Sequence, residues 1–177
     1  MGRYKDGKKI TVALSDQEFI EGMERGPFLK PKHKALLALL HYSGLRRSEI
    51  IKPVKEDFYK TKEFLYFNVW VRLKGSKRTV AIPLSLKAPY VDLIVKAVDY
   101  TRKGQRVFPY SSMTVYNIVH RVFKYPHLHR LTQITWLIKE HGVLIARQWT
   151  GLSLRTLEYY CELVGLEKVG RSLEGRQ

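Results

Sequence analysis

Apolar residues recur at helical spacing along most of this 177-residue chain, and one segment departs from that period. Residues 64–71 are aromatic and β-branched, which predicts a strand, and a turn over 74–77 leads to a second strand over 78–82. The segments that we expect to be helical are 16–25, 32–42, 47–51, 87–103, 112–124, 128–140, 144–149 and 154–164. The sequence therefore predicts a mainly α domain with one small antiparallel β-hairpin or sheet, an α+β fold.

Polar caps and glycines mark several helix ends. A Ser–x–x–Glu capping box at Ser15 predicts the first helix start, and Ser153 is expected to cap the last helix. The helix over 32–42 is expected to be amphipathic and to stop at Gly44. Arg46 is therefore expected just past a helix end, at the start of the short helix that follows.

The length of the chain predicts one domain with a substantial core. We expect a basic arm over 1–14, the folded domain over 15–165 and a polar tail over 166–177. The single cysteine, Cys161, excludes an internal disulfide and disfavours a cysteine metal site. The N-terminus lacks an apolar signal core, and no run of about eighteen apolar residues occurs, so we expect an intracellular protein without a membrane span, cytoplasmic or nucleoid-associated.

The charge balance points to a polyanionic partner. Lys and Arg number 32 against 16 Asp and Glu, a net charge of +16. Nucleic acid is the simplest such partner, because phosphate neutralisation releases counterions and drives binding. A generically basic soluble protein, or one that binds an anionic membrane surface, ranks second, because the basic residues are spread through segments that look folded and are not gathered in one tail.

Arg46 is the first candidate for chemistry. Its neighbours Leu45 and Ile50 are expected to be buried, and an arginine among apolar neighbours needs an anionic partner. Glu49 could supply that partner or orient the guanidinium group, whose planar fork can hold two phosphate oxygens. The alternative is an ordinary surface arginine at a helix start.

His127 and Arg130 are three residues apart at a predicted helix start, so their side chains share a face. A helix N-terminus favours phosphate through its free N–H groups and its dipole, and Arg130 would strengthen that preference. His127 can exchange a hydrogen bond with an oxygen near neutral pH. Alternatively, His127 is a plain turn residue and Arg130 is solvated; His129 is expected to point to another face.

Two further groups stay open from the residues alone. Lys74 lies at the hairpin turn, where a mobile lysine can enter a DNA groove or protonate a leaving alkoxide, or can simply be solvated. Tyr159 and Tyr160 are adjacent on the last predicted helix, so one should pack and the other project. The helical period does not decide between them.

Four motifs in order resemble the catalytic domain of the tyrosine recombinases. Residues 43–50 read SGLRRSEI, similar to the family's Thr-Gly-Leu-Arg-x-Ser-Glu-Leu block, and residues 74–84 resemble its Lys-Gly-x-Lys-x-Arg…Pro-Leu hairpin. Residues 127–130 match His-x-x-Arg, and residues 154–160 are similar to the block that ends in the nucleophile. The resemblance covers nearly the whole chain. It departs from the family over 149–153, where Leu-Gly-His is usual and the second histidine is missing.

The resemblance implies a function and a role for each residue. DNA would be cleaved and rejoined through a 3′-phosphotyrosyl intermediate, without a metal, another cofactor or a small-molecule substrate. The implied roles are Arg46 and Arg130 as phosphate clamps, Glu49 as the support of Arg46, Lys74 as general acid, His127 as the first histidine and Tyr160 as the nucleophile, with Tyr159 as its rival.

The same resemblance implies partners and an origin. The partner would be double-stranded DNA, on which the protein self-associates as a dimer or tetramer, with the tyrosine acting in its own site or in a neighbour's. The departures favour an archaeal viral or plasmid integrase, either a fragment or a minimal protein without the usual N-terminal DNA-clamping domain. The alternatives are a non-catalytic DNA-binding module of the same ancestry, a nicking topoisomerase and an RNA-binding basic protein.

Overall fold

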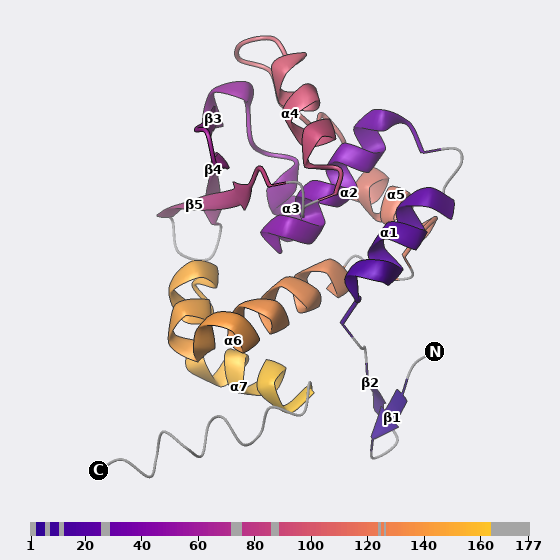
Figure 1. The fold of residues 1–177 in the computed structure, drawn as a ribbon, viewed down its shortest axis with the longest axis vertical. Helices are drawn as coiled ribbons and strands as arrows, with labels where there is room; N and C mark the ends of the chain where they lie inside the picture. The colour runs from indigo at the N-terminus through magenta and orange to yellow at the C-terminus, as the bar shows by residue number, and fades with distance from the viewer. Residues whose placement is uncertain are drawn as a thin grey trace.

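The structure is a computed structural model that describes residues 3–5, 8–10, 13–25, 29–71, 76–85, 89–123, 125 and 127–163. Its helices, a two-stranded antiparallel sheet and a three-stranded antiparallel sheet are arranged as in Figure 1. The helices are α1 (Asp16–Arg25), α2 (Pro31–Ser43), α3 (Arg47–Ile50), α4 (Val91–Asp99), α5 (Ser112–His120), α6 (His127–Thr150) and α7 (Leu154–Leu163), with a 3₁₀ turn at Lys55–Asp57. The strands are β1 (Arg3–Lys5), β2 (Lys8–Ile10), β3 (Phe58–Lys60), β4 (Phe64–Val71) and β5 (Ser76–Pro83). The predicted fold class is confirmed.

Helix ends follow the predicted signals where a cap or a glycine is present. The Glu18 N–H donates to Ser15 Oγ at 3.2 Å and the Ser15 N–H donates to Glu18 Oε2 at 2.8 Å, which forms the capping box. Gly44, with φ 60°, ends α2. Gly142, with φ 81° and ψ 167°, breaks α6 into the two helical segments that the sequence predicts.

The sheet has one strand more than the sequence predicts. β3 pairs with β4, which pairs with β5, all antiparallel. β3 is only three residues long and exposes two of them, so its sequence carries little strand signal. Phe58 stacks on its partner Phe67 with ring centroids 4.9 Å apart, and this contact joins the extra strand to the core.

Helix α2 is the centre of the larger core, and here the amphipathic prediction is wrong. Residues 35–41 are all buried, because α4, α6 and β5 contact α2 and α1 stacks Phe19 on His41, with ring centroids 3.9 Å apart. A helix covered on every side shows apolar residues all round, and a single stripe is not required.

The helix predicted over 87–103 is shorter than expected. Tyr90 has φ 67°, a left-handed conformation that no helix continues, and α4 begins at the next residue. The division of the chain into arm, domain and tail stays a prediction, since 164–177 and part of 1–12 lie outside the described residues.

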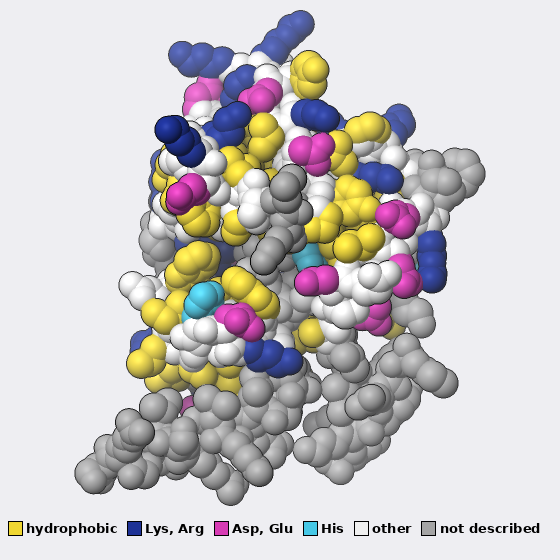
Figure 2. Space-filling model, viewed as in Figure 1, with side chains coloured by type: hydrophobic (Ala, Val, Ile, Leu, Met, Phe, Trp, Pro, Cys, Tyr) yellow, Lys and Arg dark blue, Asp and Glu magenta, His cyan; other side chains and the backbone are white. Residues whose placement is uncertain are grey.

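Helices α6 and α7 pack together below the sheet and α2 in Figure 1, around a second, smaller core. Its buried members are Leu131, Ile134, Leu137, Ile138, Ala146, Leu157, Tyr160 and Cys161. Among the described helices, none has the length and apolar character to cross a membrane. Figure 2 shows Lys and Arg side chains scattered over the face in view with acidic groups between them, and this dispersion agrees with the spread of charge in the sequence.

Candidate active site

The loop at residues 43–46, between α2 and α3, connects several functional side chains. Gly44 reverses the chain with φ 60° while its N–H donates to the carbonyl oxygen of Leu40 at 3.0 Å. A Cβ atom at Gly44 would lie only 3.0 Å from Gln133 Cβ on α6, so the loop approaches that helix closely. A glycine here satisfies both the backbone conformation and the close approach.

Arg46 is the residue before α3, and Glu49 holds it at two points. The Arg46 N–H donates to Glu49 Oε2 at 2.9 Å, and Arg46 Nη1 donates to Glu49 Oε1 at 2.9 Å. The Glu49 side chain is 5% exposed and the Arg46 side chain 36% exposed. The buried carboxylate therefore fixes a guanidinium group that still reaches solvent, in line with the orienting role considered for Glu49.

Arg130 approaches the same loop from α6. Its Nη1 donates to the carbonyl oxygen of Gly44 at 2.7 Å, and the residue is 4% exposed. Within the described part of the chain it forms no ion pair. Burial, followed by the nearby charge of Arg46, lowers the pKa of Arg130, so an anion placed here would be strongly favoured.

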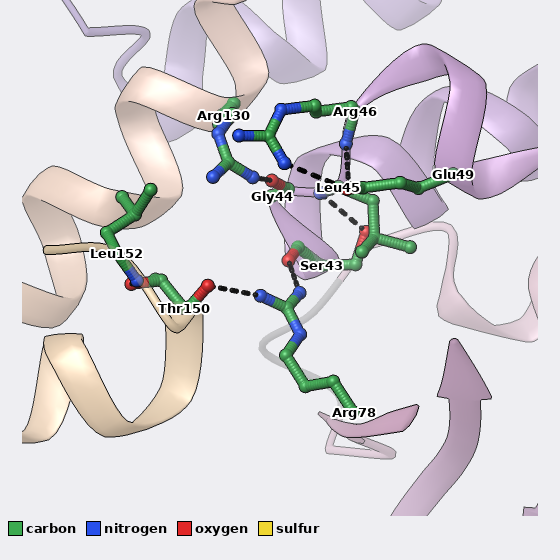
Figure 3. A network of polar contacts seen from close by, with 9 residues as sticks. All are labelled: Ser43, Gly44, Leu45, Arg46, Glu49, Arg78, Arg130, Thr150 and Leu152. Atoms are coloured by element: carbon green, nitrogen blue, oxygen red, sulfur yellow. Dashed lines mark hydrogen bonds and ion pairs between the residues drawn. The ribbon is translucent and has the colours of Figure 1, made fainter. Parts of the chain in front are cut away.

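Sequence reasoning did not single out a third arginine, Arg78. Its Nη2 donates to the carbonyl oxygen of Ser43 at 3.3 Å and its Nη1 to that of Thr150 at 3.4 Å, as Figure 3 shows. The alternation of side chains along β5 could have identified Arg78 as a residue that faces inward. Arg78 shares its face of the strand with Val80 and Ile82, which are 5% and 0% exposed.

Arg46 and Arg130 both line a pocket of about 320 Å³. His127 lies at this pocket, one helical turn before Arg130, so the two share a face as predicted. Partial burial, then Arg130 and Arg46, lower the pKa of His127, which keeps its ring neutral at pH 7. The lining residues are Leu45, Arg46, Arg47, Ser48, Tyr116, His127 and Arg130.

The two adjacent tyrosines have opposite environments, as the sequence predicts. Tyr159 is 57% exposed, whereas Tyr160 is 6% exposed and packs in the smaller core. Tyr160 lies beside Arg130: the charge of its phenolate and a side-chain hydrogen bond both raise the pKa of Arg130, against the larger effects of burial and Arg46. Neither tyrosine lines the pocket itself.

The remaining predicted residues lie elsewhere. Lys74 lies outside the described residues, between the ends of β4 and β5. His129 faces away from the pocket, as expected: it is 0% exposed, and its Nδ1 lies 3.5 Å from His41 Nδ1 in the larger core.

No carboxylate, histidine or cysteine cluster in the described part of the chain has three potential metal ligands. The pocket instead brings together Arg46, Arg130 and the neutral ring of His127, and the phenol of Tyr160 lies beside Arg130. Fixed cations and N–H donors of this kind stabilise charge that develops on phosphate oxygens.

No protein-family model matches the sequence, and no curated protein matches it. Solved structures do. The XerH site-specific recombinase, bound to a palindromic difH substrate in a post-cleavage complex, superposes with a TM-score of 0.72 at 17% identity over 97% of this chain. The XerA recombinase gives 0.69 at 20% identity over 94%, and the lambda integrase (75–356) dimer bound to a COC′ core site gives 0.61 at 17% over 82%.

These likenesses establish the fold, which is that of the tyrosine recombinase catalytic domain. The chain spans 56% of the XerH chain, 66% of the XerA chain and 59% of that lambda integrase chain.

Proposed function

We propose that this chain is the catalytic domain of a site-specific DNA recombinase that cleaves and rejoins strands through a 3′-phosphotyrosyl intermediate. One observation carries the proposal: Arg46, His127 and Arg130, from distant parts of the chain, line one pocket, and Tyr160 lies beside Arg130. The net charge of +16 supports a DNA partner. Lambda integrase, which shares the fold, is solved bound to DNA, and XerH is solved bound to its difH substrate.

In the proposed reaction, the phenolic oxygen of Tyr160 attacks phosphorus and the 5′-hydroxyl leaves. The attacked phosphate gains negative charge on its non-bridging oxygens in the transition state. Arg46 and Arg130 lie at the pocket where these oxygens would bind, and they need no reorganisation when the charge develops. The phosphotyrosyl ester keeps the bond energy, so a second 5′-hydroxyl can reverse the step.

Glu49 and His127 have supporting roles in this proposal. Glu49 orients the guanidinium group of Arg46 through a 2.9 Å ion pair while remaining buried. His127, with its lowered pKa, is neutral and offers one N–H to a phosphate oxygen. Lys74 is proposed as the general acid that protonates the leaving 5′-oxygen, on the resemblance of its hairpin motif.

Tyr160 is preferred to Tyr159 as the nucleophile on its position. The Tyr160 phenol lies beside the guanidinium group of Arg130, which lines the pocket. The Tyr159 side chain is 57% exposed, on the outside of α7.

We further propose that the protein acts on double-stranded DNA as a dimer or tetramer. Lambda integrase is solved as a dimer on a core site and as a tetramer on a Holliday junction. An intracellular, nucleoid-associated location and an archaeal viral or plasmid origin remain predictions from the sequence.

A covalent-adduct assay tests the function. The protein is incubated with a pool of nicked duplexes of randomised sequence. Cleavage near the nick releases a short strand that diffuses away, so its 5′-hydroxyl cannot reverse the step and the covalent intermediate accumulates. A protease-sensitive band of retarded DNA on a denaturing gel, with DNA attached by its 3′ end, is expected. Shifted DNA on a native gel without any adduct would instead favour a non-catalytic DNA-binding module.

The assay also separates the topoisomerase alternative. A nicking topoisomerase would relax a supercoiled plasmid of arbitrary sequence and would show no enrichment in the trapped pool. A recombinase would enrich one sequence and would exchange strands between two duplexes that carry it.

A further inference from the structure

Resting on the proposed function, we infer that Arg78 is a positioning residue. It joins β5, the loop at residues 43–46 and the corner between α6 and α7 into one rigid site. The loop carries Arg46, and the α6–α7 corner leads into the helix that carries Tyr160. Arg78 does not line the pocket, so it acts through these groups and not on the phosphate itself.

The guanidinium group of Arg78 connects two segments that are far apart in the chain. Its two terminal nitrogens donate to two different chain segments, Ser43 O at 3.3 Å and Thr150 O at 3.4 Å. The Ser43 carbonyl is adjacent in the chain to that of Gly44, which accepts from Arg130 at 2.7 Å. Consecutive carbonyls therefore hold arginines from β5 and from α6, and Figure 3 shows both guanidinium groups converging on this loop.

The second hydrogen bond of Arg78, to Thr150 O, affects the helix that carries the proposed nucleophile. Thr150 is the last residue of α6, and α7, which carries Tyr160, begins four residues later at Leu154. The Thr150 carbonyl belongs to the last turn of α6, where carbonyls lack intrahelical donors. A donor from β5 therefore fixes the corner from which α7 starts.

The chemistry of the side chain supports a dedicated role. Both hydrogen bonds are long for N–H···O geometry, and Arg78 Nε is buried without a partner among the described atoms. Burial first, and then the charge of Arg130, lower the pKa of Arg78 to about 10, with a smaller opposing effect from Glu49. A part-buried arginine without an ion-pair partner among the described residues adds little to net stability, because its desolvation cost offsets its hydrogen bonds.

The local charge is unbalanced without a ligand. Among the described residues, Arg46, Arg78 and Arg130 are accompanied in this cluster by one carboxylate, that of Glu49. A bound phosphodiester would bring negative charge to this excess, and more would develop in the transition state. The cluster is therefore suited to an anion, and Arg78 contributes by holding the segments that carry the groups at the pocket.

The test compares Arg78→Met, Arg78→Lys and a matched control, Arg102→Met. Methionine keeps much of the side-chain length without charge or donors, and lysine keeps the charge but cannot reach both carbonyls with a fork. Arg102 is exposed and follows the end of α4 (Val91–Asp99) in the chain. The readouts are the rate of adduct formation on the nicked duplex, the affinity for that duplex, and the melting temperature.

For Arg78→Met we expect adduct formation to fall by about 100-fold, with duplex affinity changed by less than about 3-fold. Its melting temperature should stay within about 4 °C of wild type, because the substitution also removes the desolvation cost of a part-buried cation that has no ion pair among the described residues. Arg78→Lys should remain below a tenth of the wild-type rate, and Arg102→Met should match wild type. Wild-type cleavage by Arg78→Met, or a loss of cleavage that only follows a loss of folded protein, overturns the inference.

A second measurement separates this inference from the proposed function. Amide hydrogen exchange over residues 146–158 is followed in the free protein. Faster exchange there in Arg78→Met than in Arg102→Met is expected, and equal exchange overturns the positioning role. If the wild type forms no adduct, the proposed function fails, and the exchange result still decides whether Arg78 holds the corner.

Discussion

Arg130 donates a 2.7 Å hydrogen bond to the carbonyl oxygen of Gly44, 86 positions earlier in the chain. Gly44 is two residues before Arg46, so this bond brings the second proposed clamp arginine to the loop that presents the first. Glu49 then orients Arg46 from the other side at 2.9 Å. The geometry of the site therefore depends on one short loop.

Replacing the proposed nucleophile should abolish the covalent intermediate. Tyr160→Phe removes the attacking oxygen but keeps the buried ring, so we expect no adduct and unchanged duplex affinity, measured by gel shift. Tyr159→Phe is the matched control, since it removes the same atom from a neighbour that is 57% exposed. Loss of the adduct in Tyr159→Phe alone would place the nucleophile one residue earlier.

The two arginines should matter more for cleavage than for binding. Arg46→Lys and Arg130→Lys keep the charge and lose the planar fork, so we expect cleavage to fall by about 100-fold or more with a several-fold change in affinity. Single-turnover cleavage and a binding isotherm on the same duplex measure the two effects. Equal losses in both would make these arginines simple backbone anchors.

Gly44→Ala should damage the site beyond its effect on stability. The left-handed backbone costs alanine about 1–2 kcal/mol, and its Cβ would approach Gln133 Cβ to 3.0 Å. Gly104→Ala is the control, with φ 76° and open space around the added atom. We expect both variants to melt lower, but only Gly44→Ala to lose cleavage per folded molecule. Undiminished cleavage in Gly44→Ala would show that the site tolerates movement of this loop.

The buried histidine pair should make the fold sensitive to mild acid. Burial, opposed by Asp16, lowers the pKa of His41 to about 4, and burial with the charge of His41 lowers that of His129 to about 3. Between about pH 6.5 and pH 4, the two histidines bind protons in the unfolded chain but stay neutral in the folded state, so the free energy of unfolding falls as the pH falls. Each histidine contributes up to about 1.4 kcal/mol per pH unit in that window.

Urea unfolding at pH 7, 6 and 5 measures this slope. His129→Leu should be less sensitive to acid than the wild type, because one of the two groups is gone, whereas the exposed His141→Leu should follow the wild type. The lowered pKa values of His33 and His127 act in the same direction and are common to both variants. Parallel curves for all three proteins would contradict the prediction.

The elements with strong local signals were predicted correctly. The capping box at Ser15, the glycine stop at Gly44, the break at Gly142 and the strand over 64–71 all depend on residues within a few positions of one another. The third strand, β3, and the full burial of α2 were missed, because both depend on segments far away in the chain.

The candidate site divides in the same way. The sequence alone determined which residue types could carry phosphate chemistry, their order along the chain, and that one of the tyrosines at 159 and 160 would be buried. Only the tertiary structure decided that Tyr160 is the buried one and lies beside Arg130, that Arg46 and Arg130 share a pocket, and that Arg78 joins their loop to the α6–α7 corner. The reason is physical: helical and strand periods record which side of an element faces inward, whereas the partner met there is set by the packing of distant segments.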